Sequence, residues 1–242
     1  EIAQCGVELI GAAGPKADLE MIALAVDALR ACGLEGFHVE LGHAGFFKDL
    51  AGRMEMDEEQ VEAMRALIEG AGRPVKVLNL FAYTGGASVA CAKSGAQVTH
   101  VDAAKGMVER AGENARLSGI NGGIRYIVDD CKKFVQREIR RGNRYDAVIM
   151  DPPSYGRGPG GELWKIEESL FPFVQLCAQV LSDDPLFFLI NSYTTGLQPA
   201  VLHNILKLCL PGHGKIDAYE VGLPTEEGIS LPCGAGGICI YD

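Results

Sequence analysis

The 242-residue sequence has no apolar run that approaches the ~20 residues of a transmembrane helix, and its first residues lack the basic region and long apolar stretch of a secretory signal. It also has no C-x-x-C pair, and its eight cysteines are scattered through apolar contexts. That scatter argues against a zinc site and against a disulfide framework. We therefore expect buried free thiols in a cytoplasmic protein that has no membrane span and no metal centre.

Positive charge is scarce in one part of the chain. Residues 1–72 hold 5 Lys or Arg against 14 Asp or Glu, whereas residues 73–242 hold 17 against 18. The acidity is thus a property of the first segment and does not exclude a polyanionic partner for the second. The stretch G-A-G-R-P at 70–74 reads as a linker. We predict an N-terminal segment at 1–72 and a domain at 73–242.

The first segment combines strand-like and helical patterns. Apolar residues recur with a helical period from Lys16 to Ala31, and the stretch from Asp57 to Glu69 is amphipathic with a capping box at its start. We predict strands at 5–10 and 37–41, helices at 16–31 and 57–69, and a short helix at 45–51. The segment is therefore expected to be a small α+β unit.

Three stretches of this segment carry a family resemblance: Q-C-G-V-E-L-I-G at 4–11, A-D-L-E-M-I-A-L-A at 17–25 and G-H-A-G-F-F-K at 42–48. On these residues the segment resembles the regulatory subunit of ATP phosphoribosyltransferase, a relative of histidyl-tRNA synthetase. The likeness covers a minority of that family's fold and lacks its other motifs, so its activity is not carried over. One alternative function follows from it: a noncatalytic regulatory or interaction protein of histidine biosynthesis that acts through residues 1–70.

The rest of the chain is organised around V-K-V-L-N-L-F-A-Y-T-G-G at 75–86. This stretch reads as a buried strand, a tight glycine turn and the start of a helix, a unit that leaves room for a nucleotide-like ligand. A second apolar strand at 97–101 ends in Asp102. A carboxylate at the tip of the second strand is where such a fold holds a pair of ribose hydroxyls. The two features together predict a nucleotide-type site.

From residue 73 onward, strands and helices alternate. We predict strands at 75–80, 97–101, 124–128, 145–150, 185–190, 215–221 and 237–241, and helices at 87–94, 104–117, 131–141, 163–181 and 198–208. Such alternation indicates an α/β, Rossmann-like, mostly parallel seven-stranded sheet with helices on both faces. An antiparallel final pair is typical of class I methyltransferases.

A second motif, Y-D-A-V-I-M-D-P-P-S-Y at 145–155, places Asp151 at the carboxyl end of the fourth strand. Pro152 and Pro153 stop ladder pairing and stiffen the backbone around this carboxylate. A rigid set of acceptors followed by the aromatic Tyr155 suits a planar target that bears an amino group. The alternative interpretation is an aspartate that caps a turn before a proline loop.

Across residues 73–242 the chain resembles S-adenosylmethionine-dependent methyltransferases related to the bacterial 23S ribosomal RNA methyltransferases. The resemblance is carried by F-A-Y-T-G-G, V-T-H-V-D-A-A-K, V-D-D-C, D-P-P-S-Y and N-S-Y-T-T-G. It implies S-adenosyl-L-methionine as cofactor and RNA, ribosomal RNA above all, as partner. A protein or small-molecule acceptor, or an inactive fusion, remains an alternative.

Position by position, the resemblance implies two groups of site residues. The cofactor group is Asn79, Phe81, Tyr83, Thr84, Gly85, Gly86, Asp102, Ala103, Asp129 and Asp130. In it, the turn residues surround the methionine part, Asp102 takes the ribose hydroxyls and Ala103 flanks the adenine. Asp130 accepts from the adenine amine, with Asp129 as the competing candidate. Many relatives have an acidic residue in place of Asn79, so its contact to the cofactor's amino group is expected to be weaker. The group at the target base is Asp151, Pro152, Pro153 and Tyr155; here the tyrosine stands one place later than in the shorter stacking motif.

The strand ends favour methylation of a nitrogen. Methylation of a pyrimidine C5 needs a cysteine nucleophile, and D-P-P-S-Y and N-S-Y-T-T-G contain none. Cys233, expected in the final loop, is a weaker candidate than a buried thiol. The basic stretch 125–144 is either a phosphate-facing stripe or an ordinary solvated helix face. Trp164, beyond the D-P-P motif, is either a substrate contact or part of the core, and Arg157 is a substrate-contact candidate.

Overall fold

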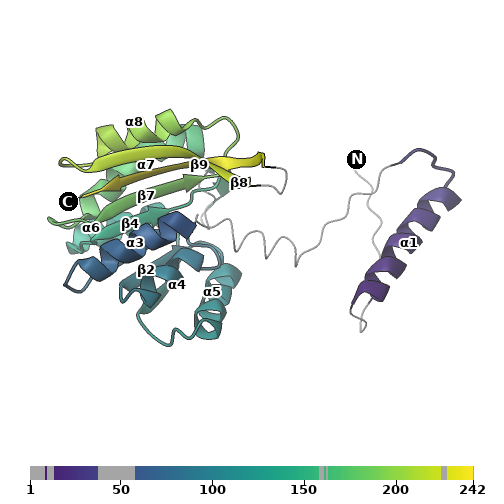
Figure 1. Ribbon diagram of the computed structural model, residues 1–242, viewed down its shortest axis with the longest axis horizontal. Helices are drawn as coiled ribbons and strands as arrows, with labels where there is room; N and C mark the ends of the chain where they lie inside the picture. Colours follow the sequence, from purple (N-terminus) through teal and green to yellow (C-terminus); the bar gives the residue numbers. More distant parts are fainter. Residues whose placement is uncertain are drawn as a thin grey trace. The chain divides into compact units, whose positions relative to one another are not determined.

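The computed structural model describes residues 9, 14–37, 58–157, 161, 163–224 and 228–241. The chain forms two compact units, Glu1–Asp49 and Leu50–Asp242 (Figure 1). In the first unit, helix α1 (Pro15–Ala31) confirms the predicted helix, with proline in its first turn and a left-handed glycine, Gly33, shortly after its end. Of the predicted strand at 5–10, only Leu9 is described, and it has no regular secondary structure; the rest of that strand, the strand at 37–41 beyond Phe37 and the short helix at 45–51 lie outside the described residues.

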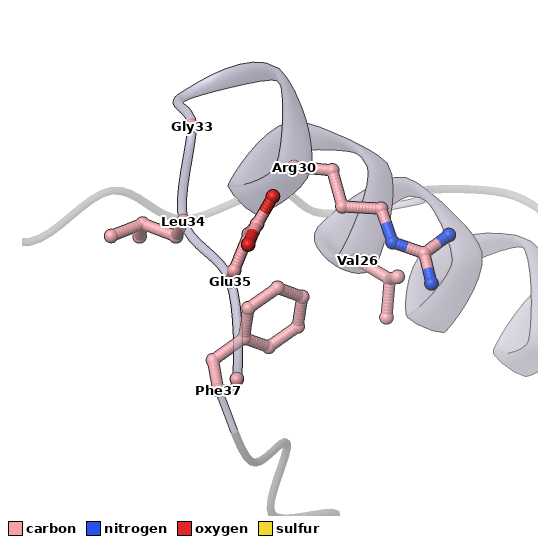
Figure 2. A pocket seen from close by; sticks show the side chains of 7 residues that line it. Val26, Arg30, Gly33, Leu34, Glu35 and Phe37 are labelled. Carbon is pink, nitrogen blue, oxygen red and sulfur yellow. The ribbon is translucent and has the colours of Figure 1, made fainter.

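A pocket lies in the first unit, where the last turns of α1 face the chain that follows it (Figure 2). Its lining residues are Val26, Arg30, Gly33, Leu34, Glu35, Gly36 and Phe37. This pocket belongs to the first unit alone.

The second unit is built on a seven-stranded sheet in the order β3-β2-β1-β4-β7-β9-β8. Its strands are β1 (Lys76–Leu80), β2 (Gln97–Asp102), β3 (Ile124–Val128), β4 (Ala147–Met150), β7 (Phe187–Ser192), β8 (Lys215–Pro224) and β9 (Ser230–Ile240). The first five strands in this order are parallel, and β9 runs antiparallel to both β7 and β8. The predicted sheet and its antiparallel final pair are confirmed.

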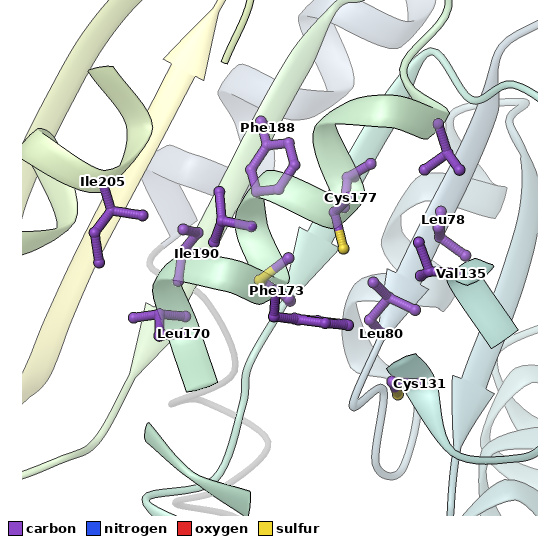
Figure 3. Packing of buried hydrophobic residues seen from close by; sticks show 14 of the residues in the cluster. Leu78, Leu80, Cys131, Val135, Leu170, Phe173, Cys177, Phe188, Ile190 and Ile205 are labelled. Atoms are coloured by element: carbon purple, nitrogen blue, oxygen red, sulfur yellow. The ribbon is translucent and has the colours of Figure 1, made fainter. Parts of the chain in front are cut away.

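Helices cover both faces of this sheet (Figure 1). They are α3 (Glu58–Gly70), α4 (Gly86–Lys93), α5 (Lys105–Leu117), α6 (Cys131–Arg141), α7 (Ile166–Cys177) with a 3-10 turn η1 (Ala178–Val180), and α8 (Pro199–Cys209). Alternate strand residues face opposite layers: Val148 packs with α6, α7 and α8, whereas Ile149 packs with α3 and α4. Figure 3 shows part of the first layer, where Phe173 of α7 lies among Leu80, Ile190 and Leu170. Burial on both faces explains why these strands read as continuous apolar runs.

Helix α3 is part of the core of the second unit. Its Met64 and Ile68 are 1% and 5% exposed and pack with apolar residues of α4, β1, β4 and β7. The division between the compact units therefore lies at residues 49 and 50, earlier in the chain than the predicted boundary at 72 and 73. The reason is that the apolar stripe of α3 is buried against the sheet that follows it.

Two local expectations are wrong. The predicted helix at 163–181 begins only at Ile166, because Leu163–Lys165 forms strand β6, which pairs with β5 (Tyr155–Arg157) in a small hairpin. Cys233 lies in strand β9 and not in a loop, since β9 begins at Ser230. Of the seven cysteines among the described residues, all are free; Cys91, Cys131, Cys177 and Cys239 are buried as expected, and Cys32 is exposed. None of the described helices is long and apolar enough to cross a membrane.

Candidate active site

The predicted site residues meet at one edge of the sheet because the parallel strands end there together. The turn 81–86 follows β1, Asp102 ends β2, and Asp129 follows β3. Asp151 follows β4, the strand that pairs with β1. In sheets of this kind, ligands bind at the carboxyl ends of the strands. This edge is therefore the candidate active site.

The turn between β1 and α4 has an unusual backbone. Phe81 and Tyr83 adopt φ angles of 53° and 45°, a left-handed conformation that costs non-glycine residues about 1–3 kcal/mol each. Gly85 has a φ of 86°, and a Cβ there would lie 2.9 Å from the Cβ of Ala111. The turn thus requires glycine at position 85, both for its backbone conformation and for the close approach of α5.

Neighbouring elements hold this turn in place. The backbone N–H of Tyr83 donates to Oδ2 of Asp102 at 2.9 Å, and the N–H of Phe81 donates to Sγ of Cys131 at 3.3 Å. The side-chain amide of Asn114 donates to the carbonyl oxygen of Thr84 at 2.9 Å. These bonds come from β2, α6 and α5, so the strained turn is fixed by the elements around it.

Asp102 is oriented by two backbone donors. Besides the bond from Tyr83, its Oδ1 accepts from the N–H of Ala104 at 2.8 Å. Because each carboxylate oxygen can accept two hydrogen bonds, both retain a position for a further donor. A carboxylate of fixed orientation with two such positions suits a pair of hydroxyl groups. Ala103, the adjacent residue, is exposed at the same edge.

Below the turn lies a buried polar chain. The side-chain amide nitrogen of Asn79 donates to Oγ of Ser88 at 2.9 Å, and the same oxygen lies 3.0 Å from Nδ1 of His100. Burial lowers the pKa of His100 to about 4, with the Asp102 carboxylate opposing part of that shift. Asn79 is 3% exposed, and its amide nitrogen is engaged with α4. Its predicted contact with a cofactor stays a prediction.

The two acidic residues after β3 differ in their partners. Asp130 caps α6, with its Oδ1 accepting from the N–H of Lys133 at 2.8 Å. Asp129 forms an ion pair with Arg137 and accepts from the N–H of Asp130 at 2.9 Å. The structure thus gives Asp130 a capping role and Asp129 an ionic partner, and which of them accepts from an adenine amine stays open.

Trp164 holds the D-P-P loop after β4 in place. The indole Nε1 donates to the carbonyl oxygen of Pro153 at 2.6 Å, and its ring packs against Phe81 and Phe173 at centroid distances of 5.1 and 5.5 Å. Of the two interpretations of Trp164, packing against the core is the one that the structure shows. Pro152 is buried, whereas Asp151 is exposed. The loop therefore presents the carboxylate to solvent on a rigid support.

Two tyrosines are exposed near this carboxylate. Tyr155 is 57% exposed and begins the β5–β6 hairpin. Tyr193, directly after β7, is also 57% exposed. Burial of part of its side chain and the nearby Asp151 carboxylate raise the pKa of Tyr193, against a hydrogen bond from the backbone of Ser154. Ser154 and Thr194 join the two loops through their hydroxyls, 2.8 Å apart.

Sequence reasoning missed Tyr193 and His100. Tyr193 follows a buried strand in the motif N-S-Y-T-T-G, so the rule that sites form at strand ends could have found it. His100 gave no such signal, because its role depends on the strand opposite: it stands in register with Asn79 across β1 and β2.

Two family models match the chain, and their matches overlap at residues 75–112. The family model of histidyl-tRNA synthetase matches residues 1–112, and that of the RNA cap guanine-N2 methyltransferase matches residues 75–180. The chain is 48% identical over 69 residues to the ATP phosphoribosyltransferase regulatory subunit of Acetivibrio thermocellus, over 28% of this chain and 16% of that protein. It is 38% identical over 94 residues to the ribosomal RNA large subunit methyltransferase K/L of Allochromatium vinosum, over 38% of this chain and 13% of that protein.

Among solved structures, the chain is similar to a SAM-dependent methyltransferase from Agrobacterium tumefaciens, with a TM-score of 0.72 and 34% identity over 76% of this chain and 61% of that one. The chain spans less than a fifth of the length of the two curated relatives, at 16% and 13%. Both resemblances expected from the sequence are confirmed. The chain joins a segment similar to the histidyl-tRNA synthetase family to a domain with the Rossmann-like fold of S-adenosylmethionine-dependent methyltransferases.

Proposed function

We propose that this protein is an S-adenosylmethionine-dependent methyltransferase that acts on RNA, with ribosomal RNA as substrate and a base nitrogen as the methylated atom. The observation that carries the proposal is the position of three features at adjacent strand ends: the glycine turn, the Asp102 carboxylate and the Asp151 loop. The match of residues 75–180 to an RNA methyltransferase model supports the substrate class. We propose the cytoplasm as its location, since the cysteines among the described residues are free thiols.

The residues at the sheet edge fit S-adenosyl-L-methionine. In this proposal the turn 81–86 holds the methionine part, Asp102 accepts from both ribose hydroxyls, and Ala103 lies against the adenine. The close approach of Gly85 to Ala111 and the two backbone donors to Asp102 keep this part of the site in its conformation before a ligand binds. The bound cofactor supplies an electrophilic methyl group on a sulfonium, so the protein mainly has to align the acceptor.

Alignment falls to the D-P-P loop and its neighbours. Asp151 accepts a hydrogen bond from the acceptor's exocyclic amine, while Pro152 and Pro153 keep the loop rigid. Tyr193 offers an exposed ring near this carboxylate, and Tyr155, four residues along the chain from Asp151, offers a second exposed ring on which a base can stack. The hydroxyl pair of Ser154 and Thr194 keeps the loops after β4 and β7 together.

Cysteine chemistry at the site is disfavoured, which supports nitrogen as the acceptor. Cys131 lies next to the turn, but it is buried, and its Sγ accepts from the N–H of Phe81. Burial raises the pKa of Cys131, so the thiolate that a covalent C5 mechanism needs is not stable there. The alternative of a noncatalytic regulatory protein is not favoured, because the second unit carries the fold and the motifs of a methyltransferase.

The first test is calorimetric titration with S-adenosylhomocysteine. We expect micromolar-range binding to the intact chain. Asp102→Ala should weaken it at least about tenfold, because a hydrogen bond to a charged group contributes about 1.5–3 kcal/mol. Asp217→Ala is the matched control, since within the described part of the chain the Asp217 carboxylate accepts only from the neighbouring N–H of Ala218 in β8. Absence of binding to a folded chain would refute the cofactor assignment.

The acceptor is tested separately with labelled S-adenosylmethionine and ribosomal RNA from cells that lack the protein. We expect the label in RNA, on a nitrogen after nucleoside digestion. Asp151→Ala should lose transfer while its affinity for S-adenosylhomocysteine stays unchanged. Label that survives ribonuclease and is lost on proteolysis would replace RNA by a protein acceptor.

A further inference from the structure

Helix α6 has an exposed basic face that its own stability does not explain. Lys132 and Arg140 are exposed with Gln136 between them, at the spacing of four that places side chains on one face of a helix. Arg144, three residues after the end of the helix, is exposed as well. We call Lys132, Arg140 and Arg144 the α6 basic row.

Helices α3 and α5 each pair exposed cations with carboxylates on the same helix. In α3, Arg65 lies 3.3 Å from Glu62; in α5, Lys105 lies 3.6 Å from Glu109. Such pairs at three or four positions are the ordinary composition of a solvated helix face. Among the described residues, no carboxylate pairs with Lys132 or Arg140.

The carboxylate that α6 does contain is turned inward. Glu138 is buried and accepts from Tyr145, Asn143 and Arg141 at 2.8, 2.7 and 3.0 Å. Burial alone would raise the pKa of Glu138, but these hydrogen bonds hold it below its ordinary value, so the charge stays inside. The outer face of α6 therefore carries Lys132, Gln136 and Arg140 and no carboxylate.

Helix stability favours only part of this arrangement. Arg140 stands in the last turn, where the helix dipole favours a cation, but Lys132 stands in the first turn, where a cation costs about 0.3–1 kcal/mol. Arg125 is exposed on the edge strand β3, which directly precedes α6 in the chain, so a further cation stands on this edge of the sheet. The charges are thus distributed along the whole helix and onto the sheet edge.

We propose that the α6 basic row, with Arg125, binds the phosphate backbone of the RNA substrate. The inference rests on the proposed function, because it assigns a surface to the RNA that the site would methylate. Lys132 and Arg140 are separated by about 12 Å along the helix, which spans roughly three to four phosphates of a stacked strand. The helix starts directly after Asp130 at the candidate site, so a strand that follows it leads its base to the edge where Asp102 and Asp151 lie.

The test is the salt dependence of RNA binding, measured by fluorescence anisotropy with a labelled single-stranded oligoribonucleotide and saturating S-adenosylhomocysteine. Lys132→Gln/Arg140→Gln is compared with Lys207→Gln/Lys215→Gln, which removes two exposed cations at the opposite edge of the sheet. If the row binds two phosphates, the double substitution should reduce the magnitude of the slope of log K against log salt by about 1.4. When salt is lowered from 1 M to 0.1 M, the affinity of the variant then rises about 25-fold less than that of the wild type. The control should keep the wild-type slope, and all three chains should bind S-adenosylhomocysteine equally.

Equal losses in the two double variants, or no loss in either, would overturn the proposal. Full displacement of the RNA by polyglutamate at equal charge concentration would also overturn it, in favour of an anionic protein. The outcome is separable from that of the proposed function, because binding is measured without methyl transfer. Methylation of RNA with an unchanged slope refutes the surface alone, whereas a changed slope without methylation refutes the reaction alone.

Discussion

The folding stability of the second unit should decrease as the pH is lowered, because of His100. This residue is 0% exposed, and its Nε2 has no hydrogen-bond partner among the described residues. Burial lowers the pKa of His100 to about 4, whereas an unfolded histidine titrates near 6.5. Between these two values the unfolded chain binds a proton that the folded chain does not, so folding stability decreases as the pH falls through that window. Above about pH 6.5 the effect is absent.

The expected size follows from the two pKa values. For a shift from 6.5 to about 4, the free energy of unfolding at pH 5 is lower by about 2 kcal/mol than at pH 7.5. Urea unfolding of the wild type and of His100→Asn at both pH values measures it. Asparagine offers Ser88 an acceptor without a titrating ring, so the variant should lack the 2 kcal/mol decrease. A packing defect in the variant is the same at both pH values and cancels in the comparison.

Other groups do not produce this difference. Burial alone would raise the pKa of Asp146, but hydrogen bonds from the Lys76 backbone and from Arg73 lower it, so its contribution is lost at more acidic pH and is shared by both chains. An equal decrease in wild type and variant would refute the buried neutral imidazole. If the variant does not fold, NMR titration of the wild type decides, since a His100 ring that protonates above pH 6 is incompatible with this reasoning.

Two further predictions concern the framework of the site. Glu138→Gln replaces one carboxylate oxygen by an NH2 donor, whereas Tyr145, Asn143 and Arg141 all donate to this carboxylate. The substitution should lower the free energy of unfolding by about 1–3 kcal/mol, measured by urea titration. An unchanged midpoint would show that the buried carboxylate is not needed. A chain that starts at residue 73 loses the buried Met64 and Ile68 of α3, and should be less stable by about 3–6 kcal/mol than one that starts at residue 50; equal stability of the two would restore the boundary at 72 and 73.

The sequence was informative where burial alone decides the structure. The strands of the parallel sheet are apolar runs because helices cover both faces, and their ends located Asp102 and Asp151. Strand β9 begins at Ser230, earlier than the predicted strand at 237–241, and its first part is rich in glycine. Glycine is required at position 234, where φ is 145° and a Cβ would collide with the backbone carbonyl of Ser192. Close backbone approach of this kind depends on the strand opposite, which a local pattern does not contain.

The β5–β6 hairpin shows a second limit. Each of its strands has three residues, too few for a period-2 pattern, and Trp164 alone fits a helix start equally well. What fixes it is the indole hydrogen bond to Pro153 and the contact with Phe81, which bring three segments of the chain together. Helix-like composition was therefore overridden by tertiary packing.

The polar chain below the turn links fold and site. Asn79 and His100 stand opposite each other on β1 and β2, on the face that α4 covers, so Ser88 of α4 can bond both. This arrangement ties the first strand, the second strand and the helix after the glycine turn together at the point where the backbone is strained. Because Phe81 and Tyr83 are held in their left-handed conformation by protein groups, the ordering of the turn does not have to be supplied by binding energy from a ligand. Asn79 thus contributes to the site through the position of the turn, whether or not it reaches the cofactor.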